Sequence, residues 1–168
     1  MSRALKIIAR LLAIAVFAAV PLAGALAVTV TAKANVKVLK PLTFKSKQDL
    51  EFGQIILGGT GTKTVSVSST GVLTCAAGLT CSGATRQAIF NVAGSNGEVV
   101  RIFAAPSDLV NATDGSTMRF TPVAPASVTL VNSGMPGLDF NVGGSIAIPS
   151  TATDGIYSGV MDVTVDYQ

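Results

Sequence analysis

The feature of this sequence that most limits its fold is an alternation of apolar and polar residues with a period of two. Short runs of this pattern recur between Gly, Asn, Asp, Ser and Pro residues, and almost nothing has the period of a helix. Successive side chains of a strand point to opposite faces of a sheet, so each run indicates a strand with one buried face. The sequence therefore predicts an all-β protein.

The strand candidates beyond the first forty residues follow one another at fairly even spacing. They are Leu50–Ile56, Thr64–Ser68, Ala88–Ala93, Val99–Ala104, Thr117–Val123, Ser127–Val131, Leu138–Val142, Ser145–Ile148 and Ile156–Tyr167. Asn96-Gly97 is a strong two-residue hairpin signal, and Asp114-Gly115, Gly143-Gly144 and Asp154-Gly155 indicate further reversals. About seven to nine short strands favour an immunoglobulin-like antiparallel β-sandwich, with a jelly roll or a barrel as the alternative.

The longest run of this alternation lies close to the N-terminus, over residues 28–38. Its apolar face consists of Val28, Val30, Ala32, Ala34, Val36 and Val38, and its polar face of Thr29, Thr31, Lys33, Asn35 and Lys37. Pro41 ends the run or marks a sheet edge, because proline has no amide hydrogen to donate to a neighbouring strand. Eleven extended residues span about 36 Å, which is enough to follow the length of a sandwich.

The first residues have the layout of a cleaved secretory signal. A basic start, an apolar stretch and a small-residue end follow in order: Arg3, Lys6 and Arg10, then residues 11–20, then Ala25 and Ala27. A membrane anchor would need about 20 uninterrupted apolar residues, whereas Pro21 and Gly24 interrupt this stretch. We therefore expect a signal peptide over residues 1–27 and a single β-sandwich domain over 28–168, with a cut after Ala34 as the alternative. Such a chain is exported to the periplasm, the outer cell surface or the medium.

Export would also remove the excess of positive charge. The chain has 12 Lys and Arg against 9 Asp and Glu, and three basic residues lie in the predicted signal, which leaves 12 − 3 = 9 against 9. The mature chain is therefore close to neutral, and its charge does not indicate a nucleic-acid partner. Five lysines nevertheless lie near its start: Lys33, Lys37, Lys40, Lys45 and Lys47. Such residues either protect a strand edge from aggregation or steer a partner.

Cys75 and Cys81 are the only cysteines of the chain. In an oxidising compartment, an isolated pair at this short spacing is expected to form one local disulfide. The chain-entropy estimate for so small a loop is only about 2 kcal/mol. We therefore expect a clip on a hairpin or loop, and not a redox or metal site.

The residues that usually carry catalysis are sparse. The chain has no His and no Trp, which removes the commonest general base and metal ligand and the best aromatic platform for a sugar or base. Asp49 and Glu51 share one strand face, as do Asp162 and Asp166, and a glycosidase could use such a pair. The polar side of an amphipathic strand explains both pairs more simply. We expect no enzyme activity, no cofactor and no bound metal.

Two further motifs have a simple structural interpretation. The Gly-rich stretch from Gly58 to Thr64 is similar to a phosphate loop, but Thr62 separates its Gly from its Lys and a strand pattern follows. We interpret it as a flexible hairpin connection. Asn111-Ala112-Thr113 is a formal N-glycosylation sequon, and we interpret it as a turn.

Three stretches together resemble a known family. They are Ala34–Leu42 (ANVKVLKPL), Asp49–Ile55 (DLEFGQI) and Asp154–Tyr167 (DGIYSGVMDVTVDY). In this order they resemble the secreted bacterial domain-of-unknown-function family 4402 over essentially the whole mature chain. The last stretch is also similar to the ends of spore coat protein U and of the pilins of archaic chaperone–usher fimbriae.

The resemblance to pilins implies a particular mode of assembly. Such pilins have an immunoglobulin-like fold without its last strand, and the N-terminal extension of one subunit fills the groove of the next. Here the run from Val28 to Val38 would be the donor strand. The acceptor groove would be lined by the last run: Tyr157, Gly159, Met161, Val163, Val165 and Tyr167. The implied partners are further copies of the chain, or a periplasmic chaperone and an usher. One departure is that the pilin bridge usually joins separate strands, whereas Cys75 and Cys81 lie close together in the sequence.

Together these features predict a non-catalytic cell-surface structural protein, such as a fimbrial or coat subunit that assembles through its strand edges. The periodicity leaves open whether the N-terminal run pairs with another copy or completes its own sheet. The alternative function is a monomeric secreted module that binds a glycan or a protein through loops such as 58–61 and 75–81. An enzyme that uses the acidic residues is a third hypothesis.

Overall fold

The computed structural model describes residues 27–168, and this part of the chain is built from strands and loops without a helix. Every pair of neighbouring strands in it is antiparallel. The all-β prediction is therefore confirmed. Over the same residues, no helix is long and apolar enough to cross a membrane. The predicted signal peptide lies, apart from Ala27, outside the described residues.

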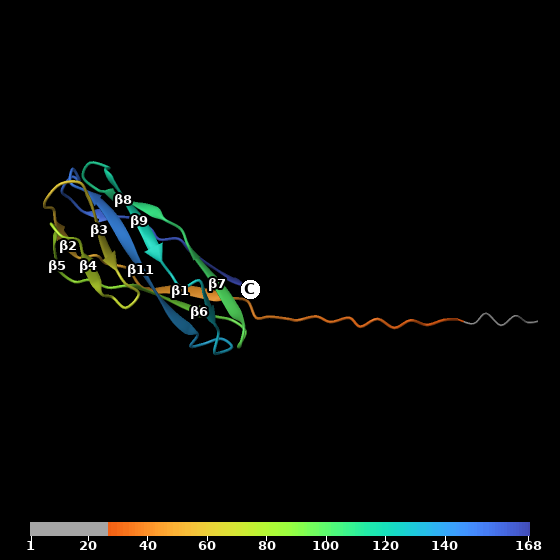
Figure 1. The fold of residues 1–168 in the computed structure, drawn as a ribbon. Coiled ribbons are helices and arrows are strands. Elements are labelled where there is room, and N and C mark those ends of the chain that lie inside the picture. The colour runs from red at the N-terminus through yellow and green to blue at the C-terminus, as the bar shows by residue number, and fades with distance from the viewer. Residues whose placement is uncertain (1–26) are drawn as a thin grey trace, which may run out of the picture. The chain divides into compact units, whose positions relative to one another are not determined.

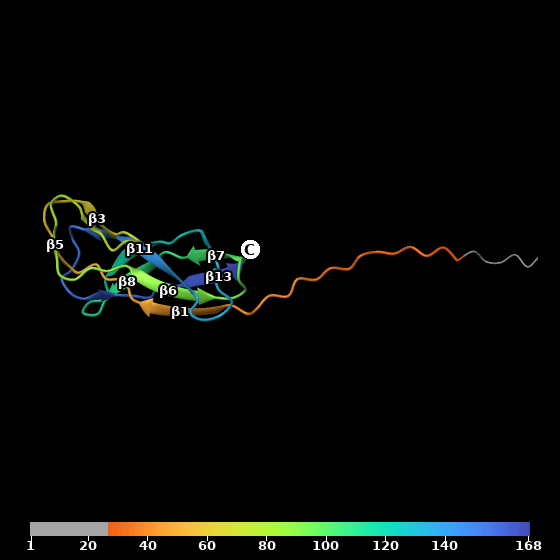
Figure 2. The ribbon, with the colours of Figure 1, turned by 90° about the horizontal axis from the view of Figure 1, so that it is seen from below.

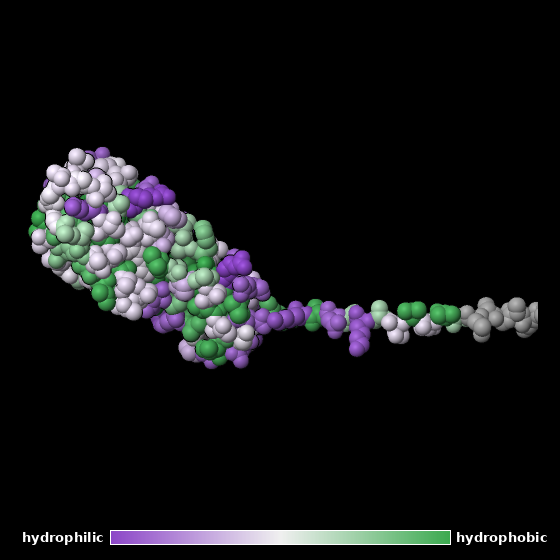
Figure 3. Space-filling model, in the orientation of Figure 1, coloured by the Kyte–Doolittle hydropathy of each residue, from purple (hydrophilic) through white to green (hydrophobic). Residues whose placement is uncertain are grey.

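The compact unit of the chain comprises Lys37–Gln168. The segment before it, from residue 27 to residue 36, has no secondary structure, and neither do residues 37–42. Val28, Val30 and Val36 are between 86% and 90% exposed. In Figure 3, apolar and polar atoms alternate along the described part of this segment. The predicted strand over 28–38 is therefore not formed in the isolated chain.

The compact unit contains three hydrogen-bonded sheets (Figure 1). The large sheet has the order β1-β6-β11-β9-β8-β12, and β3 joins it through β11 and carries β4. A second sheet has the order β10-β7-β13, and β2 pairs with β5 in a third. The strands are β1 (Thr43–Gln48), β2 (Gln54–Ile56), β3 (Thr62–Val67), β4 (Leu73–Cys75), β5 (Thr80–Ser82), β6 (Ala88–Ala93), β7 (Val99–Ala104), β8 (Ser107–Asn111), β9 (Thr117–Val123), β10 (Ser127–Thr129), β11 (Leu138–Pro149), β12 (Tyr157–Ser158) and β13 (Val163–Tyr167).

Two clusters of buried side chains form the interior. The first core joins β6 and β11 of the large sheet to β7 of the second sheet, and it consists of Ala88, Phe90, Val92, Val100, Ile102, Leu130, Phe140 and Val142. Leu42 and Phe44 pack on it from one side and Val163, Val165 and Tyr167 from β13. The second core consists of Val65, Met118, Phe120, Ile146 and Ile148, from β3, β9 and β11. Because β11 contributes to both, it connects the two ends of the unit.

The reversal predicted at Gly143-Gly144 is wrong, because both glycines lie inside the continuous strand β11. β11 pairs with β6 along its first half and with β3 along its second half, while β9 pairs with it around the glycines. A Cβ at residue 143 would overlap the backbone of Val67 and Ser68, and one at residue 144 would overlap the ring of Phe120. Glycine is needed here for close approach of neighbours, not for a turn.

Other strand predictions differ in their success. β6, β7 and β9 have the predicted bounds, and Gly97 and Gly115 adopt a positive φ as turn residues. The hairpin predicted at Asn96-Gly97 is wrong, because β6 pairs with β1 and β11 whereas β7 pairs with β10 and β13 in another sheet. β1, β4, β5 and β8 were not predicted. The last predicted run is divided, because β12 pairs with β8 in the large sheet whereas β13 pairs with β7 in the second sheet. The residues between β12 and β13 cross from one sheet to the other, and two of their carbonyls accept hydrogen bonds: Val160 from Ser107 Oγ at 2.8 Å and Asp162 from the Ala105 amide at 3.2 Å.

Candidate functional site

A large concave feature of the compact unit is an apolar groove of about 1160 Å³. One wall is formed by Ser46 and residues 48–57, and the other by residues 152–161. The floor consists of apolar side chains from four strands of the large sheet: Ala88, Phe90, Leu109, Met118, Phe120, Ile146 and Ile148. The groove thus gives access to side chains of the second core and to one edge of the first.

Each wall of the groove continues a strand that has an unpaired edge. Within residues 27–168, β1 pairs only with β6, and β13 pairs only with β7. The first wall begins in β1 at Ser46, and the second ends at Met161, two residues before β13 starts. Unpaired edges present rows of amide and carbonyl groups that another strand can use. The groove therefore combines an apolar floor with free backbone groups on the strands that lead into its walls.

Apolar side chains are also exposed along the rim. Ile56 is 62% exposed on one wall, and Ile156 and Val160 are 77% and 73% exposed on the other. Exposed apolar side chains that gather around a concave surface often indicate a binding site. The shape and composition of the groove suit an extended apolar peptide better than a small polar ligand.

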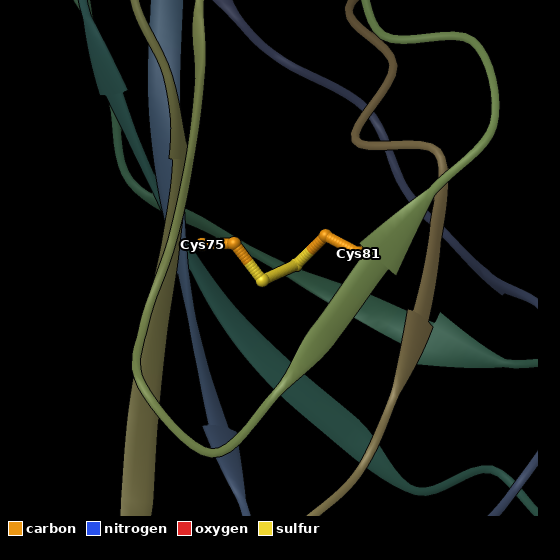
Figure 4. Close-up of a disulfide and its surroundings, with 2 residues drawn as sticks. All are labelled: Cys75 and Cys81. Atoms are coloured by element: carbon orange, nitrogen blue, oxygen red, sulfur yellow. A yellow bond between two sulfur atoms is a disulfide. The ribbon is translucent and has the colours of Figure 1, made fainter.

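The disulfide holds one wall of the groove in place. Cys75 lies at the end of β4 in the large sheet and Cys81 lies in β5, and the bond brings their Cα atoms to 6.1 Å (Figure 4). β5 pairs with β2, where Ile55 lies opposite Cys81 and lines the groove. The predicted disulfide is confirmed. The bond closes the short loop between β4 and β5, as expected of a clip on a loop, and it also joins strands of two different sheets.

A second clamp on the same wall comes from Glu51. Its backbone exchanges two hydrogen bonds with Arg86, of 2.9 and 3.1 Å. The Arg86 guanidinium also donates to the Glu51 carboxylate at 2.6 Å. These contacts attach the wall to the strand that forms part of the floor, because Arg86 lies two residues before β6.

The chain enters the compact unit at the end remote from the groove. We call Lys37–Lys40 the root. The Tyr167 hydroxyl donates to the Lys40 carbonyl and accepts from the Ser95 amide, both at 2.7 Å. Lys40 N–H donates to Ser95 Oγ at 2.7 Å, and Lys37 Nζ lies 2.7 Å from Glu98 Oε2. β1 runs away from the root toward the groove and β13 runs back toward it. In Figures 1 and 2, β5 lies at the end of the domain opposite the C-terminus.

The residues predicted for the acceptor groove divide into two sets. Tyr157, Gly159 and Met161 line the groove. Val163, Val165 and Tyr167 are half-buried on β13 and pack against the first core. The opposite wall, between Ser46 and Leu57, was not predicted as part of the site. The stretch Asp49–Ile55, which carries part of the family resemblance, lies in this wall and is a sequence signal that could have indicated it.

The remaining sequence candidates form no second site. Glu51 is engaged with Arg86, and Asp162 and Asp166 do not line the groove. The Gly-rich stretch leads directly into the strand β3, as predicted. The expectation of a hairpin connection is wrong, because β2 pairs with β5 whereas β3 pairs with β11 and β4. Asn111 is 1% exposed, and its side chain bonds the Thr113 amide and the Asp154 carbonyl. It is a buried turn residue, so its side chain is not accessible for the attachment of a glycan.

All the charged residues that line the groove are acidic. Its lining residues include Asp49, Glu51 and Asp154 but no Lys or Arg. The carboxylates with shifted pKa values, Asp114 and Asp139, lie outside the groove. A shallower pocket of about 440 Å³ is lined by Ser69, Thr70, Val123, Ala124, Pro125 and Asn141, and it includes no residue of the loops 58–61 or 75–81.

A family model described as a domain of unknown function, DUF4402, matches residues 42–167. No curated protein and no solved structure matches the chain. The matched range extends from the residue before β1 to the end of β13, so it includes both walls and the floor of the groove. The resemblance found in the sequence is thereby confirmed at the level of the family: this chain belongs to the DUF4402 family.

Proposed function

We propose that this protein is a non-catalytic, exported structural subunit of the cell surface that assembles by strand donation. In this proposal, residues 28–36 of one copy enter the groove of another copy as an additional strand, while the root, Lys37–Lys40, stays on its own compact unit. The single observation that carries the proposal is the apolar groove of about 1160 Å³ whose walls continue two strands with unpaired edges.

The N-terminal segment has the properties that such a groove requires. It alternates apolar and polar residues, it belongs to no strand in the isolated chain, and its valines are exposed. Strand addition gains affinity from main-chain hydrogen bonds and selectivity from alternate side chains that enter pockets. Burial of the three Val side chains that precede the root, Val28, Val30 and Val36, is worth up to about 5 kcal/mol. These properties favour donation over completion of the chain's own sheet.

The position of the root favours a linear assembly. The root is fixed at the end of the compact unit remote from the groove, through Tyr167, Ser95 and Glu98. In every contact, the N-terminal segment of one copy would therefore meet the groove of the next copy, so the two contacting surfaces differ. Such head-to-tail contacts produce open chains unless the rotation between copies closes a ring. A fimbria or a coat filament has this architecture.

The finer fold assignment belongs to the same proposal. The sheets β1-β6-β11-β9-β8-β12 and β10-β7-β13 would be the two layers of an immunoglobulin-like sandwich that lacks one strand between β1 and β13. The chain would be secreted after removal of residues 1–27, and the Cys75–Cys81 bond is compatible with an oxidising compartment. Before assembly, a periplasmic chaperone would cover the groove. At an usher, the N-terminal segment of the next subunit would then replace the chaperone.

The experiment compares the exported chain with a variant that lacks residues 28–36. The complete chain is expected to form a ladder of species on a denaturing gel that heat converts to monomer, because inserted strands dissociate slowly. The shortened variant keeps the root and the groove, so it should remain monomeric and bind an added peptide with the sequence of residues 27–38. The gel detects the ladder, and sedimentation velocity measures the size of the shortened variant with and without the peptide.

A substitution provides a control for composition. Val30→Asp with Val36→Asp retains the length of the segment but puts charges on its apolar face, and it should abolish assembly. Thr29→Asp with Asn35→Asp changes the outward face and should leave assembly within about threefold. A complete chain that stays monomeric, together with a peptide that does not bind, would overturn the proposal.

A further inference from the structure

The length of the groove floor matches the length of the donor segment. Along β11, the floor extends from the level of Phe140, which lies opposite the floor residue Phe90, to Ile148. This stretch, 140–148, comprises nine residues, and residues 28–36, which precede the root, are also nine. Extended strands have nearly the same rise per residue. The donor segment therefore covers the floor with no residue to spare.

The residues that follow the donor segment are not free to extend it. The Lys40 amide donates to Ser95 Oγ, and the Lys40 carbonyl accepts from the Tyr167 hydroxyl, both at 2.7 Å. The same hydroxyl accepts from the Ser95 amide at 2.7 Å. Lys37 Nζ, on the first residue of the root, lies 2.7 Å from Glu98 Oε2. The chain is therefore held by its own compact unit from the first residue after the donor segment.

We call the peptide bond between Val36 and Lys37 the joint. When the donor segment lies in the groove of one copy and the root lies on its own compact unit, no residue at the joint is left over as a linker. Slack could come only from withdrawal of the segment, which would leave Val36 and part of the apolar floor in water. Val36 is 90% exposed in the isolated chain, so its burial depends on complete insertion.

We propose that the root of the donor copy docks directly against the rim of the acceptor groove, and that this contact fixes the angle between successive copies. The inference rests on the proposed function, because it describes the joint that strand donation would produce. The partner is a second copy of this chain. The charges suit close approach, since the root contains Lys37 and Lys40 and no acidic residue, whereas all charged residues that line the groove are acidic. The filament is then a stiff rod and not a row of units on flexible linkers.

The experiment inserts Gly-Ser-Gly-Ser between Val36 and Lys37 of the complete exported chain. This insertion retains the donor segment, the root and the groove, but it adds a linker at the joint. The persistence length of the filaments, measured by electron microscopy, should fall at least about threefold because a Gly-Ser linker behaves as a flexible coil. The axial repeat should broaden and increase by up to about 13 Å.

The matched control inserts the same four residues between Ala27 and Val28, at the free end of the donor segment. It should leave the persistence length and the axial repeat unchanged, because the joint is intact. Sedimentation velocity and the unfolding midpoint are measured for both insertions. Loss of assembly confined to the insertion at the joint would also support the docking contact, because the donor segment and the groove are unaltered in that variant.

A second variant, Tyr167→Phe, loosens the root without a change in chain length. It removes the hydroxyl that holds Lys40 and Ser95 but keeps the ion pair of Lys37 with Glu98. The persistence length should fall by about twofold, which is less than the effect of the insertion at the joint. A mere loss of stability would shorten the filaments but leave their persistence length unchanged.

The outcomes distinguish the inference from the function on which it rests. If the unmodified chain does not assemble, both are overturned. If it assembles but the insertion at the joint gives filaments like those of the control insertion, only the docking of the root on the rim is overturned. If the copies close into rings, the spread of ring sizes replaces the persistence length. One size for the control and several for the insertion at the joint would support the docking, and equal spreads would overturn it.

Discussion

The root end and the groove end of the compact unit differ in what covers the large sheet. At the root end, β1 and β13 cover the first core, and Phe44, Phe90 and Phe140 form a stack with ring centroids 5.3 to 6.0 Å apart. At the groove end, the second core has Met118, Phe120, Ile146 and Ile148 in the floor of an open groove. Both ends share β11, so the sheet beneath them is continuous.

The difference lies in what covers the sheet. The root end is covered by strands of the chain itself and fastened by the Tyr167 hydroxyl. The groove end has walls without a strand between them, and these walls are held by the disulfide and by the Glu51–Arg86 contacts. Walls without a strand between them need such reinforcement, because the packing that would otherwise stabilise them is absent.

The largest expected effect tests the contrast between the two cores. Phe140→Ala removes a ring that is 5% exposed from the first core, away from the groove, and should lower the free energy of unfolding by about 3–5 kcal/mol. Phe120→Ala removes a ring from the groove floor, where the space left behind opens into the existing groove, so its cost should be smaller. Urea denaturation measures both. Equal losses would mean that the two cores are equally well packed.

The next effect concerns the reinforced wall. Replacement of both Cys75 and Cys81 by Ser should lower the free energy of unfolding by about 2 kcal/mol. Hydrogen exchange should become faster at Ile55 and its neighbours in β2, because β5 is then no longer tied to β4. Exchange in β7 at the root end provides the internal control. A uniform increase in both regions would contradict a local role of the bond at the groove.

A smaller effect compares the tyrosines at the two ends. Tyr167→Phe keeps the ring in the first core but removes the hydroxyl that bonds Lys40 and Ser95, and it should cost about 1 kcal/mol. Tyr157→Phe at the groove end removes bonds to Thr153 and Ser116 and is the matched variant. Only Tyr167→Phe should accelerate amide exchange at Ser95 and Lys40. Equal acceleration in both variants would show that the root is not fastened by Tyr167.

The smallest effect is a dependence of stability on pH. The Lys47 ammonium, followed by the Asn91 amide, holds the pKa of Asp139 below its ordinary value of 3.8, and the Ser116 amide and hydroxyl do the same for Asp114. A lowered pKa contributes stability that is present above the unfolded value and is lost as the pH falls through the folded value. The unfolding midpoint should therefore decrease between pH 5 and pH 2. Asp139→Asn should make this decrease shallower, and an unchanged slope would rule out a role of the Lys47 pair.

Much of the fold follows from the sequence, because period-two alternation has a direct physical cause. β6, β7 and β9 were predicted with their bounds, and each carries buried residues at every second position. β1 was missed because Phe44 is the single large apolar residue among its six. β4, β5 and β8 are short or polar, and their pairing depends on distant partners. Gly143-Gly144 has the composition of a turn, and its place in a strand follows from pairing with β3 and β9, which are distant in the sequence.

The candidate site could be predicted only in part. The alternation of the donor segment and of the last run is visible in the sequence, and so is the pair of cysteines. The groove itself is a shape made by residues from six separate stretches of the chain, and periodicity contains no information on which neighbours are missing. The crossing between β12 and β13 depends likewise on which sheet each half joins. Its outcome is that Tyr157, Gly159 and Met161 line the groove while Val163, Val165 and Tyr167 do not.

The placement of the root has a consequence for the ends of any filament. If each copy gives one segment and accepts one, a row of copies always keeps one bare groove at one tip and one unused segment at the other. The bare tip would expose Ile56, Ile156 and Val160 to solvent, so it would collect further copies until something else occupied it. Growth could then be stopped by a different protein that offers a segment of its own but has no groove, and the length of the filament would depend on the supply of that terminator.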